Sequence, residues 1–413
     1  MWKEYSMAER RGLQKATARQ YRTANKKEKG ALLKDFVEKT KYNRCYAGWM
    51  LRNYGRNVVG WQGKQRVVYV GDGKRRRRRK RIYGDKEVRA LKKIWYCLDC
   101  PCGKRLAPYL KVIIPQLQAQ GELRLDGQTR SKLEQISART IERLVSGEKR
   151  KWEIRGKSRT KPGTLLKSQI PIRTFAEWDE KMPGFVEMDT VSHDGGQEQG
   201  IFAQSIDATD VCTGWTETMA VANRSNVRVL EGIQRLRRQF PFPWKGLDTD
   251  GGGEFINHDL VTYCEHEQLE FTRSRPYRKN DSCYVEQKNW MVVRKVVGYY
   301  RYETAQELAL LNRIYGLLRL YTNFFQPQMR LLNKERIGSK IRRAYDEAKT
   351  PYQRVMEHPG VTVEIKKQLK TQARALNPVS LKRSLLSLQG NLFRLALRKP
   401  WYQNKRRSSE QFR

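Results

Sequence analysis

The chain has 413 residues, enough for two to four domains, and its 84 Lys and Arg residues against 43 Asp and Glu residues give a formal net charge of +41. So large an imbalance indicates a polyanionic partner, and nucleic acid is the expected one because basic side chains on phosphates release condensed counterions. A membrane partner is disfavoured, since no apolar run approaches about 18 residues and the chain begins with no signal-peptide pattern.

The first predicted domain, residues 1–72, is helical. Four apolar side chains share one helical face: Leu32, Leu33, Phe36 and Val37. A polar break at 41–43 separates this helix from the next, which is the helix-turn-helix pattern that places its second helix in a DNA major groove. Arg44 and Arg52 are therefore candidate DNA contacts. A small helical bundle without a DNA role would show the same pattern.

Two basic segments are expected to be linkers. Residues 73–84 contain the unbroken run KRRRRRKR, which cannot fold on itself, and Arg76 and Arg78 are candidate contacts to phosphates or a minor groove. A linker whose charge serves only solubility is the alternative. The second basic linker covers residues 149–171.

Between the linkers, residues 85–148 are predicted to form a second helix-turn-helix domain that begins at the N-cap Asp85. Its last two helices carry apolar residues at helical spacing: Leu133, Ile136, Ile141 and Leu144. Arg139 and Arg143 are candidate DNA contacts there. Two such domains in tandem favour a protein that recognises DNA through two separate domains.

Three cysteines cluster in this domain, namely Cys97, Cys100 and Cys102. The CxxC spacing suits zinc, but no second CxxC or HxxxH lies nearby, so we favour free thiols near a helix end. The total of seven cysteines is odd, which indicates reduced thiols in a cytoplasm-like compartment.

In residues 172–303 the sequence pattern changes to short runs of residues that favour β-strands. The order of three strands, helix, strand, helix, strand and helix predicts a mixed sheet flanked by helices. Residues 304–413 are predicted to be helical and basic, starting with a capping box of Thr304 and Glu307. Two further helical segments are expected there, around 333–357 and 361–397.

Three acids stand out in the α/β region. Asp189 lies on the first predicted strand, and Asp250 ends the fourth strand in front of three glycines that permit a sharp turn. Glu286 shares a helical face with Asn289, Trp290, Val293 and Val297, which directs its carboxylate toward the sheet. Clustered buried carboxylates need a cation, and Mg²⁺ or Mn²⁺ suits oxygen ligands. Ordinary loop acids are the alternative.

Other charged residues lie near these acids in the sequence. Asp248 lies on the same strand face as Asp250, which we prefer as the ligand because of the following glycines, and Asp207 is expected to be structural. Lys288, Arg294 and Lys295 follow Glu286 and are candidate contacts to DNA phosphates. The alternative is that they form the solvated face of the helix.

The order, spacing and context of the acids resemble those of the DDE transposase and retroviral integrase superfamily. Asp250 and Glu286 are separated by 35 residues, TDGGGEF (249–255) is similar to the family's second motif, and SRPYRKNDSCYVEQKN (274–289) is similar to its third. Bacterial insertion-sequence transposases with an integrase catalytic core are the group it resembles, over roughly residues 130–330. Gly251 departs from the usual Asn, and the retroviral zinc-binding segment is absent.

The resemblance implies an RNase H-like catalytic core in which Asp189, Asp250 and Glu286 bind two Mg²⁺ or Mn²⁺ ions. It implies nicking of transposon ends and joining of the 3′-hydroxyl to target DNA. Double-stranded DNA (terminal inverted repeats and target) is the implied partner of a homo-oligomer in the bacterial cytoplasm, at the nucleoid. A non-catalytic DNA-binding regulator or architectural protein and an RNase H-like nuclease are the alternatives.

Overall fold

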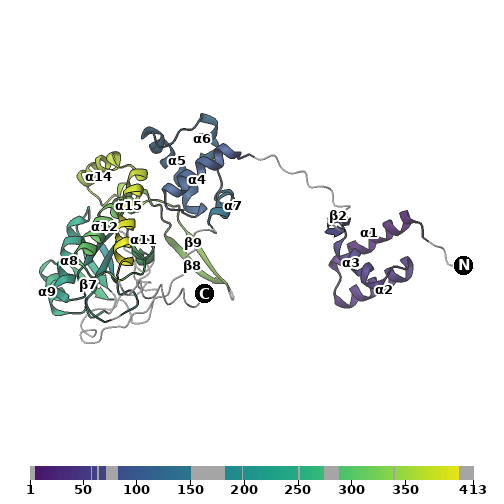
Figure 1. Cartoon of the computed structure of the whole chain (residues 1–413), viewed down its shortest axis with the longest axis horizontal. Helices are drawn as coiled ribbons and strands as arrows, with labels where there is room; N and C mark the ends of the chain where they lie inside the picture. The colour runs from purple at the N-terminus through teal and green to yellow at the C-terminus, as the bar shows by residue number, and fades with distance from the viewer. Residues whose placement is uncertain are drawn as a thin grey trace. The chain divides into compact units, whose positions relative to one another are not determined.

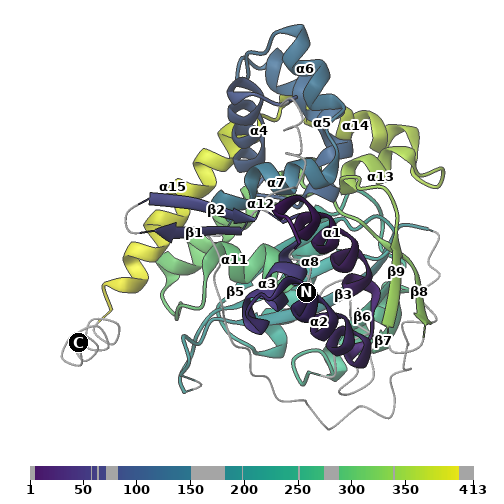
Figure 2. The same ribbon diagram turned by 90° about the vertical axis from the view of Figure 1, so that its right-hand side faces the viewer.

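The computed structural model describes residues 5–56, 58–62, 65–70, 82–149, 182–197, 199–249, 252–273, 288–337 and 340–399. These fall into two units, Met1–Ile82 and Tyr83–Arg413. Figures 1 and 2 show the helices and strands of each unit. Within the described part of the chain, every helix is too short or too polar to span a bilayer.

The N-terminal unit consists of three helices and a β-hairpin: α1 (Met7–Thr23), α2 (Lys26–Thr40), α3 (Arg44–Asn53), β1 (Val58–Gln62) and β2 (Gln65–Val70). Capping boxes begin α1 at Ser6 and α2 at Asn25, and each satisfies two backbone N–H groups at the start of its helix. Its core contains Ala18, Tyr21, Phe36, Ala47 and Leu51. The predicted break at 41–43 is present, with Lys41 in the left-handed conformation that ends α2. The hairpin was not expected.

The second unit begins with four helices: α4 (Asp85–Cys97), α5 (Gly103–Ala119), α6 (Gly127–Glu134) and α7 (Ala138–Lys149). Gly84 is the N-cap of α4, so Asp85 lies one residue further into the helix than predicted. The Glu87 carboxylate closes this end by accepting the Gly84 N–H at 2.8 Å. Leu133, Ile136 and Ile141 are buried, as their spacing predicted.

A mixed five-stranded sheet with its helices follows: β3 (Phe185–Ser192), β4 (Gln204–Asp210), β5 (Thr216–Val221), α8 (Asn226–Gln239), β6 (Gly246–Thr249), α9 (His258–His266), β7 (Glu270–Arg273), the π-helical turn η3 (Asn289–Arg294) and α11 (Lys295–Val297). The strand order is β5-β4-β3-β6-β7. β3, β4 and β5 form an antiparallel meander, whereas β6 runs parallel to β3 and β7 parallel to β6. The predicted order of strands and helices is confirmed.

Helices cover both faces of this sheet. On one face α8 approaches closely at Gly232, where an added Cβ would lie 2.6 Å from Ile206 Cδ1. On the other face lie η3 and α12 (Ala305–Phe325), whose Asn312 side chain bonds both the N–H and the C=O of Ala220. The predicted capping box of Thr304 and Glu307 begins α12. The mixed sheet covered by helices on both faces agrees with the predicted RNase H-like core.

The C-terminal region contains β8 (Leu331–Ile337), β9 (Lys340–Tyr345), α13 (Pro351–Glu357), α14 (Val363–Ala375) and α15 (Pro378–Leu397). β8 and β9 pair as an antiparallel hairpin, so the predicted helix around 333–357 is wrong for its first part. The strongly helix-forming Lys, Arg and Glu residues of this segment misled the prediction. The region is otherwise helical, as expected.

The four helices α4–α7 share one hydrophobic core with α12 and α15. Tyr109 donates its hydroxyl to the Phe324 carbonyl at 3.3 Å, and Tyr321 donates to the Cys97 carbonyl. Asp99, in the left-handed conformation after α4, forms ion pairs with both Lys295 of α11 and Lys382 of α15. These contacts fasten the helical block to the sheet region.

Candidate active site

One face of the sheet carries a row of acids and hydroxyls around Asp189. Asp189 on β3 pairs with Asp207 on β4, which in turn pairs with Thr218 on β5. Directly paired residues project to the same face of a sheet. Glu187, two residues before Asp189, lies on this face too and pairs with Asp248 of β6. The central strands therefore present a polar face toward η3 and α12.

The Asp189 carboxylate is half-buried and accepts hydrogen bonds from neutral donors. Its Oδ1 accepts the Thr190 N–H at 2.7 Å. Its Oδ2 accepts the side-chain amide of Asn289, the first residue of η3. These bonds leave both oxygens oriented by the protein, which is the state that a metal-binding carboxylate requires.

Asp250 and Glu286 lie outside the described residues, but their chain neighbours are described. Thr249, which precedes Asp250, pairs with Met188, which precedes Asp189. Asn289, three residues after Glu286, bonds Asp189. Among the residues that the structure describes, no three His, Cys, Asp or Glu side chains form a metal-binding group. Asp189 is among these described residues, whereas Asp250 and Glu286 are not.

Asp248 lies on the same face of the sheet as Asp189 and bonds to the neighbouring strand β7. Its side chain is buried, and its Oδ1 accepts the Thr272 hydroxyl of β7 at 2.6 Å. The structure thus gives Asp248 a partner within the sheet. Asp207 is also buried, and its Oδ1 accepts the Thr218 hydroxyl at 3.0 Å.

Lys288 is buried in this polar face, although we expected it at a DNA-facing or solvated surface. Its Nζ donates to the Thr216 hydroxyl at 2.9 Å and to the Gly214 carbonyl at 3.3 Å. Burial raises the pKa of Asp207 and lowers the pKa of Lys288, while the opposite charge of each favours ionisation of the other. The buried acids of β4 thus draw the lysine inward, which local sequence did not reveal.

Trp290 is also placed differently from the prediction. Its side chain is 53% exposed, whereas Val293 and Val297 are fully buried as expected. Residues 289–294 form a π-helical turn, whose i→i+5 bonding changes the angular position of each side chain. The i+4 spacing from Glu286 therefore does not keep Trp290 on the sheet-facing side.

Glu254 is a site residue that sequence reasoning missed. Its buried carboxylate accepts the Thr190 hydroxyl at 2.7 Å and forms a 2.7 Å ion pair with Arg224. The loop that follows Asp250 is thereby tied to the residue that follows Asp189. In the sequence, Glu254 is the glutamate of the TDGGGEF stretch, and its place in that motif could have indicated a role at the site.

The remaining candidate DNA contacts fall into three groups. Arg44 and Arg52 on α3 and Arg139 and Arg143 on α7 are exposed. Arg294 is half-buried with its guanidinium 4.8 Å from the centre of the Tyr299 ring, and Lys295 pairs with Asp99. Arg76 and Arg78 lie outside the described residues.

The cysteine cluster contains free thiols in the structure. Cys97 is buried, whereas Cys100 and Cys102 are partly buried at the junction of α4 and α5. Burial raises the pKa of the Cys97 thiol to about 11. Among the described residues, no three potential metal ligands gather there.

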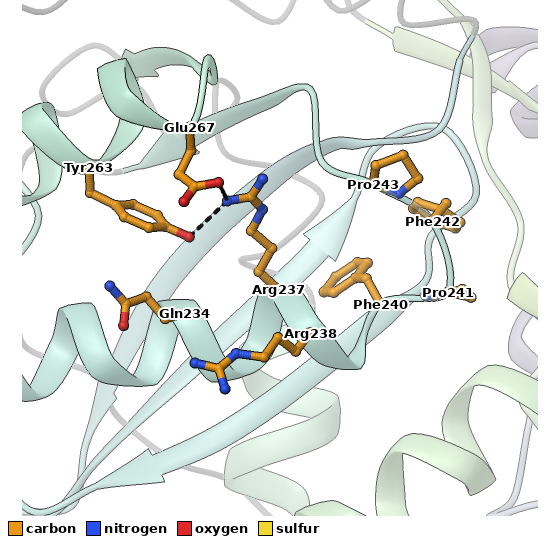
Figure 3. Close-up of a pocket in the computed structure, with 9 residues that line it drawn as sticks. All are labelled: Gln234, Arg237, Arg238, Phe240, Pro241, Phe242, Pro243, Tyr263 and Glu267. Carbon is orange, nitrogen blue, oxygen red and sulfur yellow. Dashed lines mark hydrogen bonds and ion pairs between the residues drawn. The ribbon is translucent and has the colours of Figure 1, made fainter.

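A surface pocket lies between α8, α9 and the loop after α8, apart from the acids. Figure 3 shows Arg237 of α8 directed toward Tyr263 and Glu267, to which it bonds at 3.0 and 2.5 Å. That contact lowers the pKa of the Glu267 carboxyl. None of the predicted site residues lines this pocket. It belongs to the opposite side of the sheet from η3.

The chain is similar to several known proteins. A family model described as the integrase core domain matches residues 179–279. The chain is 36% identical over 356 residues to "Uncharacterized protein y4rM" of Sinorhizobium fredii (strain NBRC 101917 / NGR234), covering 86% of this chain and 97% of that protein. A solved structure, the catalytic core domain of BIV integrase, is similar with a TM-score of 0.26 and 16% identity, covering 41% of this chain and 91% of that one.

Proposed function

Because the chain belongs to the DDE transposase and integrase superfamily, we propose that it is a DNA transposase. It would nick the ends of a mobile element and join the freed 3′-hydroxyl to target DNA. We assign Asp189, Asp250 and Glu286 as the catalytic acids and as ligands of two Mg²⁺ or Mn²⁺ ions.

One observation carries this proposal: neighbours of all three acids meet at one place on the sheet. Met188 pairs with Thr249, so Asp189 and Asp250 follow directly from two paired residues of parallel strands. Asn289 bonds Asp189, so the helical segment that Glu286 precedes is docked on the same strand. Peptide geometry limits how far Asp250 and Glu286 can lie from these contacts.

The side chains present suit divalent ions that prefer oxygen ligands. The three assigned residues are carboxylates, and Asp189 is oriented by donors from Thr190 and Asn289. When bound, two such ions stabilise the charge that develops on the attacking and leaving oxygens of an in-line phosphoryl transfer. The protein would contribute the fixed placement of the acids, with Glu254 and Thr190 tying the second acid's loop to the first acid's strand.

DNA recognition would come from the helical regions. Arg44 and Arg52 on α3, and Arg139 and Arg143 on α7, are exposed cations on helices that follow a tight turn. We propose that they contact the terminal inverted repeats, and that two copies of the chain assemble on DNA so that two element ends are joined together.

Cleavage and strand transfer with purified full-length protein and Mg²⁺ test the proposal. Asp189→Asn, Asp250→Asn and Glu286→Gln should each lower both activities by about 10³-fold or more, because several kcal/mol of transition-state stabilisation is lost. Asp259→Asn, an exposed acid on α9, is the matched control. DNA binding should survive in all four variants.

Other outcomes separate the alternatives. Normal cleavage by Glu286→Gln, or cleavage that persists in EDTA, would contradict the assignment. Binding without any Mg²⁺-dependent nicking would identify a regulator or architectural protein. Nicking without strand joining would identify an RNase H-like nuclease.

A further inference from the structure

The β8–β9 hairpin rises from a firmly fixed base. Arg330, just before β8, donates to the Val211 carbonyl in the β4–β5 turn at 3.0 Å. Asp346, just after β9, accepts the Arg330 N–H at 2.6 Å and pairs with Arg354 of α13 at 2.7 Å. Gln328 and Lys349 bond each other's backbones below these contacts. The strands therefore start from a fixed position on the sheet region.

The same β4–β5 turn also touches the catalytic segment. Lys288, two residues after Glu286, donates to the Gly214 carbonyl of this turn. An added Cβ at Gly214 would lie 3.0 Å from the Gln328 side chain at the hairpin's base. The hairpin and the proposed active site are therefore built on one turn of the sheet.

Above its base the hairpin is uncovered. β8 and β9 form a separate two-stranded sheet, and in the described chain neither packs extensively against another helix or strand. Ile341 and Tyr345 are 47% and 46% exposed. Figures 1 and 2 both show the two strands side by side at the edge of the second unit. An isolated hairpin is only marginally stable in water, which indicates that a partner covers it.

The charge of the hairpin indicates the nature of this partner. Five basic residues and one acid give residues 331–345 a net charge of +4. The side chains of Arg342 and Arg343 are exposed and make no hydrogen bond or ion pair with any described residue. A second copy of so basic a hairpin would be repelled. A polyanion is therefore the partner that the charge favours.

We propose that the β8–β9 hairpin binds double-stranded DNA as a ribbon lying in a groove. A major groove, about 12 Å wide, admits a two-stranded ribbon. Consecutive strand residues project to opposite faces, so Arg342 and Arg343 present one cation to each wall of the groove. This inference rests on the proposed function for its choice of DNA, and it adds a contact element next to the active site.

Equilibrium binding of the full chain to a fluorescein-labelled duplex of arbitrary sequence, in EDTA and over a range of salt, tests the inference. Arg342→Glu with Arg343→Glu should lower the slope of log affinity against log salt by about 1.8, since each lost phosphate contact removes about 0.9. The matched control is Lys370→Glu with Arg374→Glu, an exposed pair on α14 with the same change in charge. It should leave the slope unchanged.

A photo-crosslinking amino acid in place of Ile341 gives a second measurement. We expect an adduct with the duplex. Equal slopes for the hairpin and α14 variants, or an adduct with another copy of the chain, would overturn the inference. Because these measurements are made in EDTA, they do not depend on catalysis. Normal cleavage by the acid variants would defeat only the proposed function, and an unchanged hairpin slope would defeat only the hairpin contact.

Discussion

The two faces of the central sheet differ in what they bury. The face toward α8, called the apolar face here, centres on the fully buried side chains of Val186, Ile206 and Leu247, although the register also places the buried acids Asp210 and Glu217 on it. The face toward η3 carries Asp189, Asp207 and Thr218 on the same strands. Burying apolar groups stabilises the fold, whereas burying acids costs free energy unless cations and donors compensate. The apolar side chains toward α8 stabilise the fold, and the face toward η3 carries the candidate catalytic acid Asp189.

Besides the strand hydroxyls of Thr218 and Thr272, one short segment compensates the acids of the polar face. Lys288 donates to Thr216 and Gly214, and Asn289 donates to Asp189. Both residues immediately follow the stretch that contains Glu286. The segment that contains Glu286 therefore also supplies a cation and hydrogen-bond donors that stabilise the neighbouring acids. The following changes separate the roles of the two faces.

The largest effect on stability is expected on the apolar face. Leu247→Ala should lower the free energy of unfolding by about 3 to 4 kcal/mol, because it leaves a cavity between β6 and its neighbours. Urea denaturation measures this change. Val363→Ala, at a side chain that is 74% exposed on α14, should change it by less than about 0.5 kcal/mol. Equal losses in the free energy of unfolding for the two substitutions would show that the apolar face is not the main source of stability.

On the polar face, Asn289→Leu should affect catalysis more than folding. Loss of the amide bond to Asp189 should raise the Mg²⁺ concentration needed for half-maximal cleavage by about 10- to 100-fold. Titration of cleavage with Mg²⁺ measures this shift. Trp290→Ala, at the next and exposed side chain, is the matched control. An unchanged Mg²⁺ requirement in Asn289→Leu would mean that Asn289 does not position Asp189.

Lys288→Met should lower the free energy of unfolding by about 2 kcal/mol. It removes the donor to Gly214 and Thr216 and leaves Asp207 buried without its neighbouring cation. Adding Asp207→Asn should recover part of this loss, because the neutral amide needs no counter-charge. Urea denaturation of both single variants and the double variant gives the coupling. Strict additivity would exclude an interaction between the two side chains.

The smallest effect is a pH dependence that comes from His193. The imidazole is fully buried with Nε2 2.7 Å from the Ser205 hydroxyl, and burial lowers its pKa from 6.5 to about 3, with a smaller contribution from Arg294. Below pH 6.5 the unfolded chain therefore binds a proton that the folded chain does not. The resulting stability is complete above that pH and is lost as the pH falls toward 3.

Between pH 6.5 and 5.5 this term amounts to about 1 kcal/mol. His193→Gln should remove it, so the difference in unfolding free energy between wild type and variant should change by that amount. Asp210 acts in the opposite direction because burial raises its pKa to about 6. The comparison with the variant isolates the histidine. A difference that does not change with pH would contradict the burial of a neutral His193.

Several features could be predicted from the sequence because they depend on nearby residues. The strands of the meander were separated by turns at Gly200 and Gly214, and the capping box of Thr304 and Glu307 lies within one helical turn. The hairpin at 331–345 was missed because Lys, Arg and Glu favour helices. Its Gly338-Ser339 pair between two short runs was the available hairpin signal.

The details of the candidate site depended on residues far apart in the chain. Lys288 is buried because Gly214 and Thr216, more than 70 positions earlier, offer it acceptors. Glu254 meets Thr190 across 64 positions. No helical or strand periodicity contains such contacts, since they arise only when the sheet forms. The assignment of Asp189 needed only its strand and the resemblance.

The ion pairs of Asp99 have a geometric consequence. Asp99 fastens the helical block that ends in α7 to Lys295, on the segment continuing from η3, and to Lys382 on α15. The block and the polar face of the sheet are thereby joined by side-chain contacts within one unit. Were α7 to hold a duplex, as proposed above, these contacts would fix its separation from β3, and that separation would set the number of base pairs between the recognised sequence and the cut.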